Sequence, residues 1–433
     1  MQIDPPALTA ALDRVKTLHP KVIDLSLGRI ERLLADLGAP HLRVPPVIHV
    51  AGTNGKGSVV AMIRAVLEAS GYRVHVYTSP HLVSFTERIR LSGSLIDSAL
   101  LVDLIDYVLE INGDAPITFF EITTAVAFQA FGQIPADVLI LETGLGGRLD
   151  ATNVVPHPAA TVLTPIGMDH MSYLGDTLNA IAGEKAAIMK PGTPCISARQ
   201  HPDAAEVIKA VAAKRAVDVA WQDADWSVEA DPFGTVRYKD AETEWSVPQP
   251  SLPGPHQIGN LGVALATLAR LPLSIPSFGL RAGMRQIDWP ARCQKLTRGP
   301  LTAGLPSGWD LWLDGGHNPP AGDALAAWLA DEPAPTVLIT GMMANKDITG
   351  FLAPIAPHAQ ALAAVSIPNH EDGCATPEDI ASAASRAGIQ DTLAARDLAA
   401  ARDALTPHIS GHRGRVLICG SLYLAGEVLK THG

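Results

Sequence analysis

The segment with the clearest capacity for chemistry is the glycine-rich stretch HVAGTNGKGS at residues 49–58. Backbone N–H groups of such a loop approach a phosphate closely, Lys56 is placed to reach the terminal phosphates of a nucleotide, and Ser58 to bind magnesium. The spacing departs from the ordinary G-x-x-x-x-G-K-S/T pattern, because Gly57 separates the lysine from the serine. A plain glycine-rich turn with an exposed lysine is the alternative. We predict nucleotide binding by Gly52, Thr53, Asn54, Gly55, Lys56, Gly57 and Ser58.

Polar residues also follow the expected ends of three strands. Glu142 closes the apolar run DVLILE and precedes a glycine-rich loop, GLGGR at 144–148. Ligands of open α/β sheets lie beyond the carboxyl ends of strands, so Glu142 is placed to hold magnesium, with a solvated acid beside a turn as the alternative. His170 follows a second strand, although a lone histidine is more often structural. Asp314 and His317 follow a third strand, where they could meet a ribose or adenine group and a phosphate, unless the segment is a plain turn.

Strands and helices must alternate to position these loops. Apolar residues at helical spacing predict helices between residues 25 and 38 and between 59 and 67. Near-continuous apolar strands that alternate with helices imply a parallel sheet covered on both faces. The expected strands are Val47–Val50, Val74–Tyr77, Val138–Leu141, Thr161–Leu163, Cys195–Ser197, Leu311–Asp314, Val337–Thr340, Leu362–Ile367 and Arg415–Cys419.

The pattern changes twice along the chain. Residues 221–247 alternate between polar and apolar types around the turn-like Asp231–Gly234, which predicts a small antiparallel element. Strand and helix patterns resume after Pro300, and we expect a linker over Asp288–Pro300. The predicted fold class is therefore α/β. A P-loop ATPase-like parallel sheet domain at 1–292 contains a small β element at about 221–250, and a Rossmann-like α/β domain follows at 293–433.

Composition narrows the classes of function. The chain has 433 residues, of which 47% are hydrophobic, and 33 basic against 44 acidic residues give a formal net charge of −11. This balance argues against nucleic-acid binding. No apolar run approaches the roughly 20 residues that span a bilayer, so we expect a soluble, cytoplasmic protein without a membrane partner. Four scattered cysteines fit neither a disulfide framework nor a zinc site, and are expected to be reduced.

Taken together, the motifs resemble the folylpolyglutamate synthase and dihydrofolate synthase family, the folate branch of the Mur-type ligases. The resemblance covers nearly the whole chain and keeps the family's order of motifs. It rests on HVAGTNGKGS (49–58), TSPHL (78–82) with Glu87-Arg88, ETGLGGRLDATN (142–153), IGMDH (166–170), IAGEKAAIMK (181–190), LPGPHQIGN (252–260), WPARCQ (289–294), LDGGHNP (313–319) and CGSLYLAGEVL (419–429).

The resemblance implies a central ATPase domain, a smaller Rossmann-like domain and an active site between them. It implies that Asn260, Arg292 and Asp314 bind ATP with His317 close by, and that Lys185 is carbamylated, which would turn a cation into an oxygen ligand for magnesium. From its surroundings in the sequence alone, Lys185 is an exposed helix charge. Two magnesium ions are expected near Ser58, Ser79, Glu142, His170 and Lys185, and the expected catalytic residues are Lys56, Lys185, His170 and His317.

The expectation about the acceptor substrate rests mostly on one short segment. Asp24-Leu25-Ser26-Leu27 resembles the dihydropteroate-binding loop of bacterial bifunctional members, whereas the alternative is that Asp24 caps a helix starting near Leu25. An aromatic wall and a carboxylate suit a flat pterin ring. The expected substrate-binding residues are Asp24, Leu25, Ser26, Leu27, Phe120, Glu121, Leu149, Asp150 and Ala151. The sequence departs from the family at Ala291, where glycine is usual, at Gly316, where alanine is usual, and at Asn345, where aspartate is usual.

The resemblance implies an ATP-dependent ligase that joins the amine of L-glutamate to the carboxylate of dihydropteroate, of a reduced folate, or of both, through an acyl phosphate. Its partners would be these small molecules, ATP and magnesium, and we expect a monomer. Two alternatives stay open. A Mur-type cell-wall ligase shares the phosphate loop and the mechanism, and a P-loop nucleotide switch would hydrolyse its nucleotide without an amine acceptor.

Overall fold

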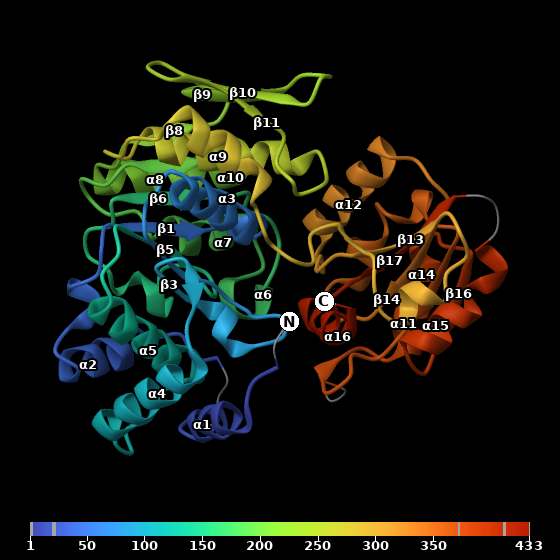
Figure 1. Ribbon diagram of the computed structural model, residues 1–433, viewed down its shortest axis with the longest axis horizontal. Coiled ribbons are helices and arrows are strands. Elements are labelled where there is room, and N and C mark those ends of the chain that lie inside the picture. The colour runs from blue at the N-terminus through green and yellow to red at the C-terminus, as the bar shows by residue number, and fades with distance from the viewer. Residues whose placement is uncertain (1–2, 20–22, 371–372, 410–412, 433) are drawn as a thin grey trace. The chain divides into compact units, whose positions relative to one another are not determined.

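The computed structural model describes residues 3–19, 23–370, 373–409 and 413–432. The chain divides into two compact units (Figure 1). The larger unit comprises Asp4–Ser251 and Ile258–Asp288. The C-terminal unit comprises the described residues of 289–433 together with Leu252–Gln257 and Ile3, so the short segment at 252–257 groups with the second unit and not with the first. In the part of the chain that the structure describes, no helix is long and apolar enough to cross a membrane.

The larger unit is built on an eight-stranded sheet with the order β4-β3-β2-β5-β1-β6-β7-β8. In the order of the sheet, β2, β5, β1, β6, β7 and β8 pair in parallel with their neighbours. At the other edge, β3 pairs antiparallel with β2 and with β4. The parallel sheet is therefore confirmed, with an antiparallel edge that the sequence pattern did not indicate. The strands are β1 (Val47–Ala51), β2 (Val74–Tyr77), β3 (Ile89–Leu91), β4 (Ser94–Leu95), β5 (Val138–Glu142), β6 (Ala160–Leu163), β7 (Cys195–Ser197) and β8 (Val219–Trp221).

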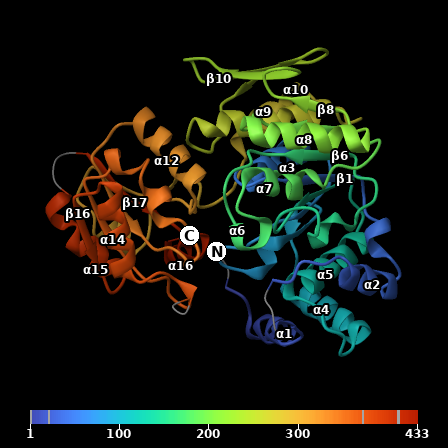
Figure 2. The ribbon, with the colours of Figure 1, turned by 180° about the vertical axis from the view of Figure 1, so that it is seen from behind.

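Helices cover both faces of this sheet. Figures 1 and 2 show α3, α9 and α10 on one side and α2, α4 and α5 on the other. Leu139 and Leu141 of β5 join the apolar core formed with α1, α2, α4 and α5. The helices are α1 (Pro6–Lys16), α2 (Gly28–Asp36), α3 (Lys56–Ala69), α4 (Ser98–Asn112), α5 (Phe119–Gln133), α6 (Met171–Leu174), α7 (Leu178–Ala186), α8 (Pro202–Arg215), α9 (His256–Ala269) and α10 (Ser277–Arg285).

The small antiparallel element is present as a three-stranded sheet of β9 (Trp226–Ala230), β10 (Thr235–Asp240) and β11 (Glu244–Pro248). Its buried face carries Trp226, Val236 and Tyr238. It packs closely on α9, because a Cβ atom at Gly262 would lie 2.5 Å from Val228 Cγ1. The alternation of polar and apolar residues thus predicted this element correctly.

The C-terminal unit contains a six-stranded sheet with the order β12-β13-β17-β14-β15-β16, in which only β12 is antiparallel to its neighbour. Two predictions are wrong here. β12 lies inside the expected linker Asp288–Pro300, and the strand expected over Leu362–Ile367 ends at Ala364. The elements are β12 (Gln294–Leu296), β13 (Trp309–Leu313), β14 (Thr336–Thr340), β15 (Ala361–Ala364), β16 (Asp391–Ala394), β17 (Gly414–Cys419), α11 (Pro300–Ala303), α12 (Pro319–Asp331), α13 (Ile348–Leu352), α14 (Pro377–Ala387), α15 (Leu398–Ala404) and α16 (Leu422–His432).

Candidate active site

The carboxyl ends of neighbouring parallel strands bring the first group of predicted residues to one edge of the larger sheet. β1 lies between β5 and β6, with Val50 opposite Glu142 and Ala51 opposite Leu163. The phosphate loop after β1, Glu142 at the end of β5 and the segment 164–170 after β6 therefore leave the sheet side by side. Ser79 follows β2, which pairs with the other side of β5.

Hydrogen bonds join the phosphate loop to the segment after β6. The backbone N–H groups of Thr53 and Asn54 donate to the carbonyl oxygen of Pro165 at 3.0 and 3.3 Å. The hydroxyl of Thr53 donates to the carbonyl oxygen of Gly167 and accepts from its N–H, both at 3.0 Å. These hydrogen bonds fix the start of the phosphate loop to the segment that follows β6.

Gly55 at the start of α3 has a conformation that suits glycine. Its φ of 86° lies in the left-handed region, and a Cβ atom there would lie 2.5 Å from Oδ1 of Asn260. The structure thus places Asn260, a predicted ATP-binding residue on α9, directly against the phosphate loop. Ser58 lies in the first turn of α3 and is buried.

Lys56 and Lys185 share a hydrogen-bond acceptor. The Nζ atom of Lys56 donates to the carbonyl oxygens of Gly52 and Thr53 at 3.1 and 3.2 Å. The Nζ atom of Lys185, on α7, donates to the same Gly52 oxygen at 2.9 Å. Lys185 is only 5% exposed, so its interpretation as an exposed helix charge is wrong. Burial, followed by the positive charge of Lys56, lowers the pKa of Lys185 to about 7.

Several of the expected magnesium ligands fit a cation at this edge. The hydroxyl of Ser79 is buried and has no hydrogen-bond partner among the described residues, and Glu142 is 5% exposed. Nε2 of His170 lies 3.8 Å from the carboxylate of Asp169. The described residues contain no cluster of three or more His, Cys, Asp or Glu side chains that could hold a metal, and only two members of the expected set are of these types. Hydroxyl and carboxylate oxygens are nevertheless the donors that magnesium prefers.

The residues expected to bind the pterin ring lie around the loop that follows β5. Asp150 is buried, and its carboxylate accepts hydrogen bonds from the backbone N–H groups of Leu145 and Thr152 at 2.8 and 3.0 Å. Burial raises the pKa of Asp150, although these hydrogen bonds oppose the rise. The ring of Phe120 packs against Gly144, where a Cβ atom would lie 2.4 Å from it. Leu149 is half-buried and Ala151 is buried at the start of a 3₁₀ helix (Ala151–Val154).

The helix predicted between residues 25 and 38 is present as α2, but the segment Asp24–Leu27 precedes it and is not part of it. α2 begins at Gly28, and its N-cap residue, Leu27, makes no side-chain capping bond. The alternative that Asp24 caps the helix is wrong. Leu25 packs with Leu145 on the apolar cluster that contains Ile181 of α7, whereas Leu27 packs on the core with α2 and α5, and Ser26 between them is half-buried.

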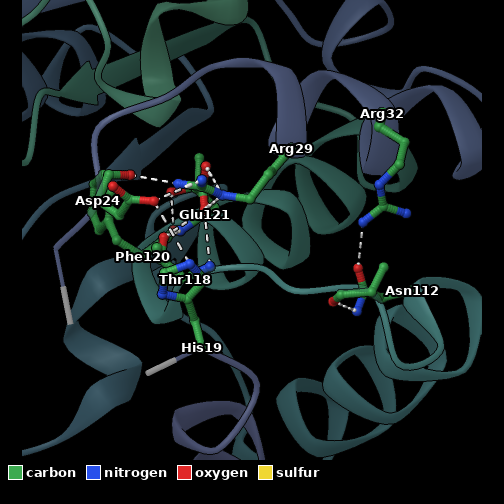
Figure 3. A network of polar contacts seen from close by, with 10 residues as sticks. His19, Asp24, Arg29, Arg32, Asn112, Thr118, Phe120 and Glu121 are labelled. Atoms are coloured by element: carbon green, nitrogen blue, oxygen red, sulfur yellow. Dashed lines mark hydrogen bonds and ion pairs between the residues drawn. The ribbon is translucent and has the colours of Figure 1, made fainter. Parts of the chain in front are cut away.

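The charged residue that holds this segment, Arg29, was missed by sequence reasoning. Nη1 of Arg29 donates to the carboxylate of Asp24 at 2.9 Å, and its Nε donates to the carboxylate of Glu121 at 2.9 Å (Figure 3). Glu121 belongs to a capping box with Thr118 at the start of α5. The T-x-x-E spacing of Thr118 and Glu121 was a usable signal for that helix start. No sequence signal links Arg29 to a partner 92 positions away.

In the C-terminal unit, Asp314 organises the loop after β13. Its carboxylate accepts hydrogen bonds from the backbone N–H groups of Cys293 at 2.8 Å and Gly316 at 2.7 Å. Arg292 donates to the carbonyl oxygen of Ala291 at 2.8 Å, and Nδ1 of His317 lies 2.8 Å from the carbonyl oxygen of Gly315. Ala291 has a φ of 56°, which explains why glycine is favourable at this position.

Comparison with known proteins shows the family of this chain. The family model of the Mur ligase middle domain matches residues 50–268, and that of the dihydrofolate synthetase C-terminal domain matches residues 305–431. The dihydrofolate synthase/folylpolyglutamate synthase of Bacillus subtilis (strain 168) is 37% identical over 359 residues, which cover 78% of this chain and 80% of that protein.

Solved structures extend the likeness to the whole fold. A structure of Escherichia coli FolC in complex with DHPP and ADP has a TM-score of 0.87 at 30% identity, with 98% of both chains covered. A bifunctional folylpolyglutamate synthase/dihydrofolate synthase from Yersinia pestis, complexed with AMPPNP and a Mn ion, has a TM-score of 0.85 at 30% identity, again with 98% of both chains covered.

The fold and the site define the class as Mur-type ligases, which depend on ATP. Within this class, the chain belongs to the dihydrofolate synthase/folylpolyglutamate synthase family. Membership of this family argues against the alternative of a nucleotide switch. The match of the C-terminal domain favours the folate branch over the alternative of a cell-wall ligase.

Proposed function

We propose that this enzyme is bifunctional, forming dihydrofolate from dihydropteroate and also extending reduced folates with glutamate. The observation that carries the proposal is that Leu25, in the segment Asp24–Leu27, and Ala51, which precedes the phosphate loop, belong to one apolar cluster of the larger unit. Leu25 packs with Leu145 on the same apolar cluster as α7, the helix that bears Lys185. The proposed acceptor-binding segment thus packs on the cluster of the helix that bears Lys185, and Lys185 in turn donates to the carbonyl oxygen of Gly52 in the phosphate loop.

The chemistry follows from what a carboxylate needs in order to react with an amine. An oxygen of the acceptor carboxylate attacks the γ-phosphorus of ATP, the bond to ADP breaks, and an acyl phosphate forms. The amine of glutamate then attacks the acyl carbon, and inorganic phosphate leaves as the amide bond forms. Lys56 stabilises the charge of the transferred group once its ammonium exchanges the carbonyl oxygens of Gly52 and Thr53 for phosphate oxygens.

A divalent cation supplies further charge neutralisation on the phosphates. The residues proposed to hold it are Ser58, Ser79, Glu142 and His170, with Lys185 in its carbamylated form. On the C-terminal unit, Arg292, Asp314 and His317 are proposed to contact ATP.

The test supplies the purified protein with ATP, magnesium, glutamate and dihydropteroate as the sole acceptor. Dihydrofolate and ADP are expected in equal amounts, and a parallel reaction with tetrahydrofolate is expected to give its glutamylated form. Omitting glutamate should stop product formation in both reactions. Extension of tetrahydrofolate without any dihydrofolate synthesis would show that the first half of the proposal is wrong.

We also propose that Lys185 carries a carbamate in the active enzyme. Only a neutral amine attacks CO2, in a reaction that forms the N–C bond and releases the amine proton. Burial and the charge of Lys56 lower the pKa of Lys185 to about 7, so much of the amine is neutral near neutral pH. The resulting carboxylate would be close to Gly52 and the phosphate loop, where an oxygen ligand for magnesium is useful.

The carbamate is detectable without an activity assay. Protein equilibrated with ¹³C-labelled CO2 should show one carbamate carbon signal by NMR, and Lys185→Gln should remove it. Lys190→Gln is the matched control, because Lys190 is also partly buried near the same helix and should leave the signal in place. A wild-type spectrum without a carbamate signal would contradict the assignment.

A further inference from the structure

Glu121 is the fixed end of a chain of ionic hydrogen bonds in the larger unit. Its carboxylate is 5% exposed and accepts from the backbone N–H and the hydroxyl of Thr118 at 2.8 and 2.7 Å. A buried carboxylate is stable only when its charge is paired, and Arg29 supplies the positive partner through Nε. The guanidinium plane is therefore anchored on the first turn of α5.

The other side of the same guanidinium holds the acceptor-binding segment. Nη1 of Arg29 donates to Oδ2 of Asp24 at 2.9 Å, and Nη2 donates to the backbone carbonyl oxygen of Asp24. The Asp24 side chain is 36% exposed, so water alone would satisfy it and the contact is not needed to bury its charge. Its effect is to fix the position of the backbone at Asp24 relative to α5.

The anchor also lies next to the aromatic wall proposed for the pterin. Phe120 precedes Glu121 on α5, its ring packs on Gly144, and it lies 6.2 Å from the ring of Tyr77. Figure 3 shows Arg29 between Asp24 and Glu121, with Phe120 beside them. One side chain thus holds two proposed walls of the acceptor site, the segment Asp24–Leu27 and the start of α5, at a fixed separation.

We propose that Arg29 is a positioning residue that fixes the segment Asp24–Leu27 against the start of α5 and thereby sets the affinity for dihydropteroate. The inference rests on the proposed function. A guanidinium is required because its planar fork presents separate N–H groups to Glu121 and to Asp24, whereas the single ammonium of lysine cannot reproduce this bridging geometry.

The test compares Arg29→Lys with Arg32→Lys. Arg32 lies one turn further along α2 and bonds Asn112 at 2.7 Å and Asp36 at 3.2 Å, so it matches Arg29 in type and helix but is not bonded to Asp24 or Glu121 (Figure 3). Arg29→Lys is expected to raise KM for dihydropteroate about tenfold, as expected for the loss of one hydrogen bond to a charged group. Its KM values for ATP and glutamate should stay within about twofold of wild type, and Arg32→Lys should leave all three constants unchanged.

Glu121→Gln removes the negative charge at the other end of the bridge and keeps the inference testable if Arg29→Lys fails to fold. The amide oxygen still accepts from Thr118 and Arg29, so a smaller rise of KM for dihydropteroate is expected. A folded Arg29→Lys protein with wild-type KM for dihydropteroate would overturn the inference, as would an equal rise of KM for ATP, which a merely structural role would give. Failure of the wild-type protein to use dihydropteroate would instead overturn the proposed function.

Discussion

At the residue scale, two lysines donate to one carbonyl oxygen, that of Gly52. Like charges at this separation in a buried site repel, and the more buried lysine gives up its proton more easily. The pKa of Lys185 is therefore lowered first by its burial and second by the positive charge of Lys56. The shared acceptor links Lys56, which is proposed to bind phosphate, to the residue proposed to be modified.

Replacement of Lys56 tests the assignment of the phosphate loop. Lys56→Ala should lower the ligase rate by a factor of about 10² to 10³, because the transferred phosphoryl group loses a positive charge. Stability should change little, since the Lys56 side chain bonds only two carbonyl oxygens of its own loop. The measurement is ADP release together with a thermal melt, and Lys214→Ala, on the exposed side of α8, serves as the control. Normal turnover in a folded Lys56→Ala protein would show that this loop does not bind the reacting phosphates.

The pH dependence of CO2 uptake gives a second prediction for this lysine pair. A lysine with a pKa of about 7 is protonated and unreactive below that pH and neutral above it, so at constant dissolved CO2 the carbamate signal should grow between pH 6 and pH 8. Lys56 lowers the pKa of Lys185, so removing its charge in Lys56→Ala should raise that pKa and move the midpoint to higher pH. An unchanged midpoint in Lys56→Ala, measured by the ¹³C signal, would mean that the two ammonium groups do not interact.

At the element scale, the sequence predicted the strands well because each central strand is an apolar run closed by a polar residue or a glycine. Glu142 ends β5 and the phosphate loop follows β1, as expected for a parallel sheet. The start of α2 could not be predicted, because the helical spacing of apolar residues continues back through Leu27. α2 nevertheless starts at Gly28, after a segment in which Asp24 bonds Arg29 and Leu25 packs on a different apolar cluster from Leu27.

The sequence also did not predict that Lys185 is buried, because its burial depends on packing by another segment of the chain. α7 has small and apolar residues around the lysine, but only the packing of the glycine loop after β5 shows that the lysine faces inward. Gly147 approaches α7 so closely that a Cβ atom there would lie 2.7 Å from the carbonyl oxygen of Glu184 and 3.1 Å from that of Lys185. The element that carries Lys185 is thus placed by a glycine in another loop.

Gly147→Ala should therefore move α7. The Cβ atom would meet backbone oxygens that cannot rotate away, so the variant should lose about 1–3 kcal/mol of unfolding free energy and show a weaker carbamate signal. Gly183→Ala is the matched control on α7 itself, because its Cβ atom would lie 3.9 Å from the nearest atom, Cγ1 of Val207. Chemical denaturation should find the control at least as stable as wild type, since alanine favours a helix. Equal stability of the two variants would contradict the tight contact.

At the scale of the whole molecule, the two units could be recognised from the sequence because each repeats its own alternation of strands and helices. Contacts between segments that lie far apart in the sequence could not be recognised in this way. The bridge of Arg29 to Glu121 spans 92 positions, and β12 pairs with β13 although its own sequence reads as a linker. Both contacts depend on which elements meet in space, which local propensity and periodicity do not encode.

The residues that the structure describes contain one lysine-bearing phosphate loop, Gly52–Ser58. A bifunctional enzyme with a single loop of this kind can react with only one acceptor molecule at a time. Only one carboxylate at a time can attack one γ-phosphorus, so dihydropteroate and tetrahydrofolate should exclude each other even if their pterin rings are held differently. With both acceptors present, each should act as a competitive inhibitor of the other with an inhibition constant equal to its own KM. With both acceptors at saturating concentrations, the combined rate of ADP release should lie between the two separate maximal rates. Rates that simply add at saturating concentrations of both acceptors would require two independent reaction centres and would contradict this single-site account.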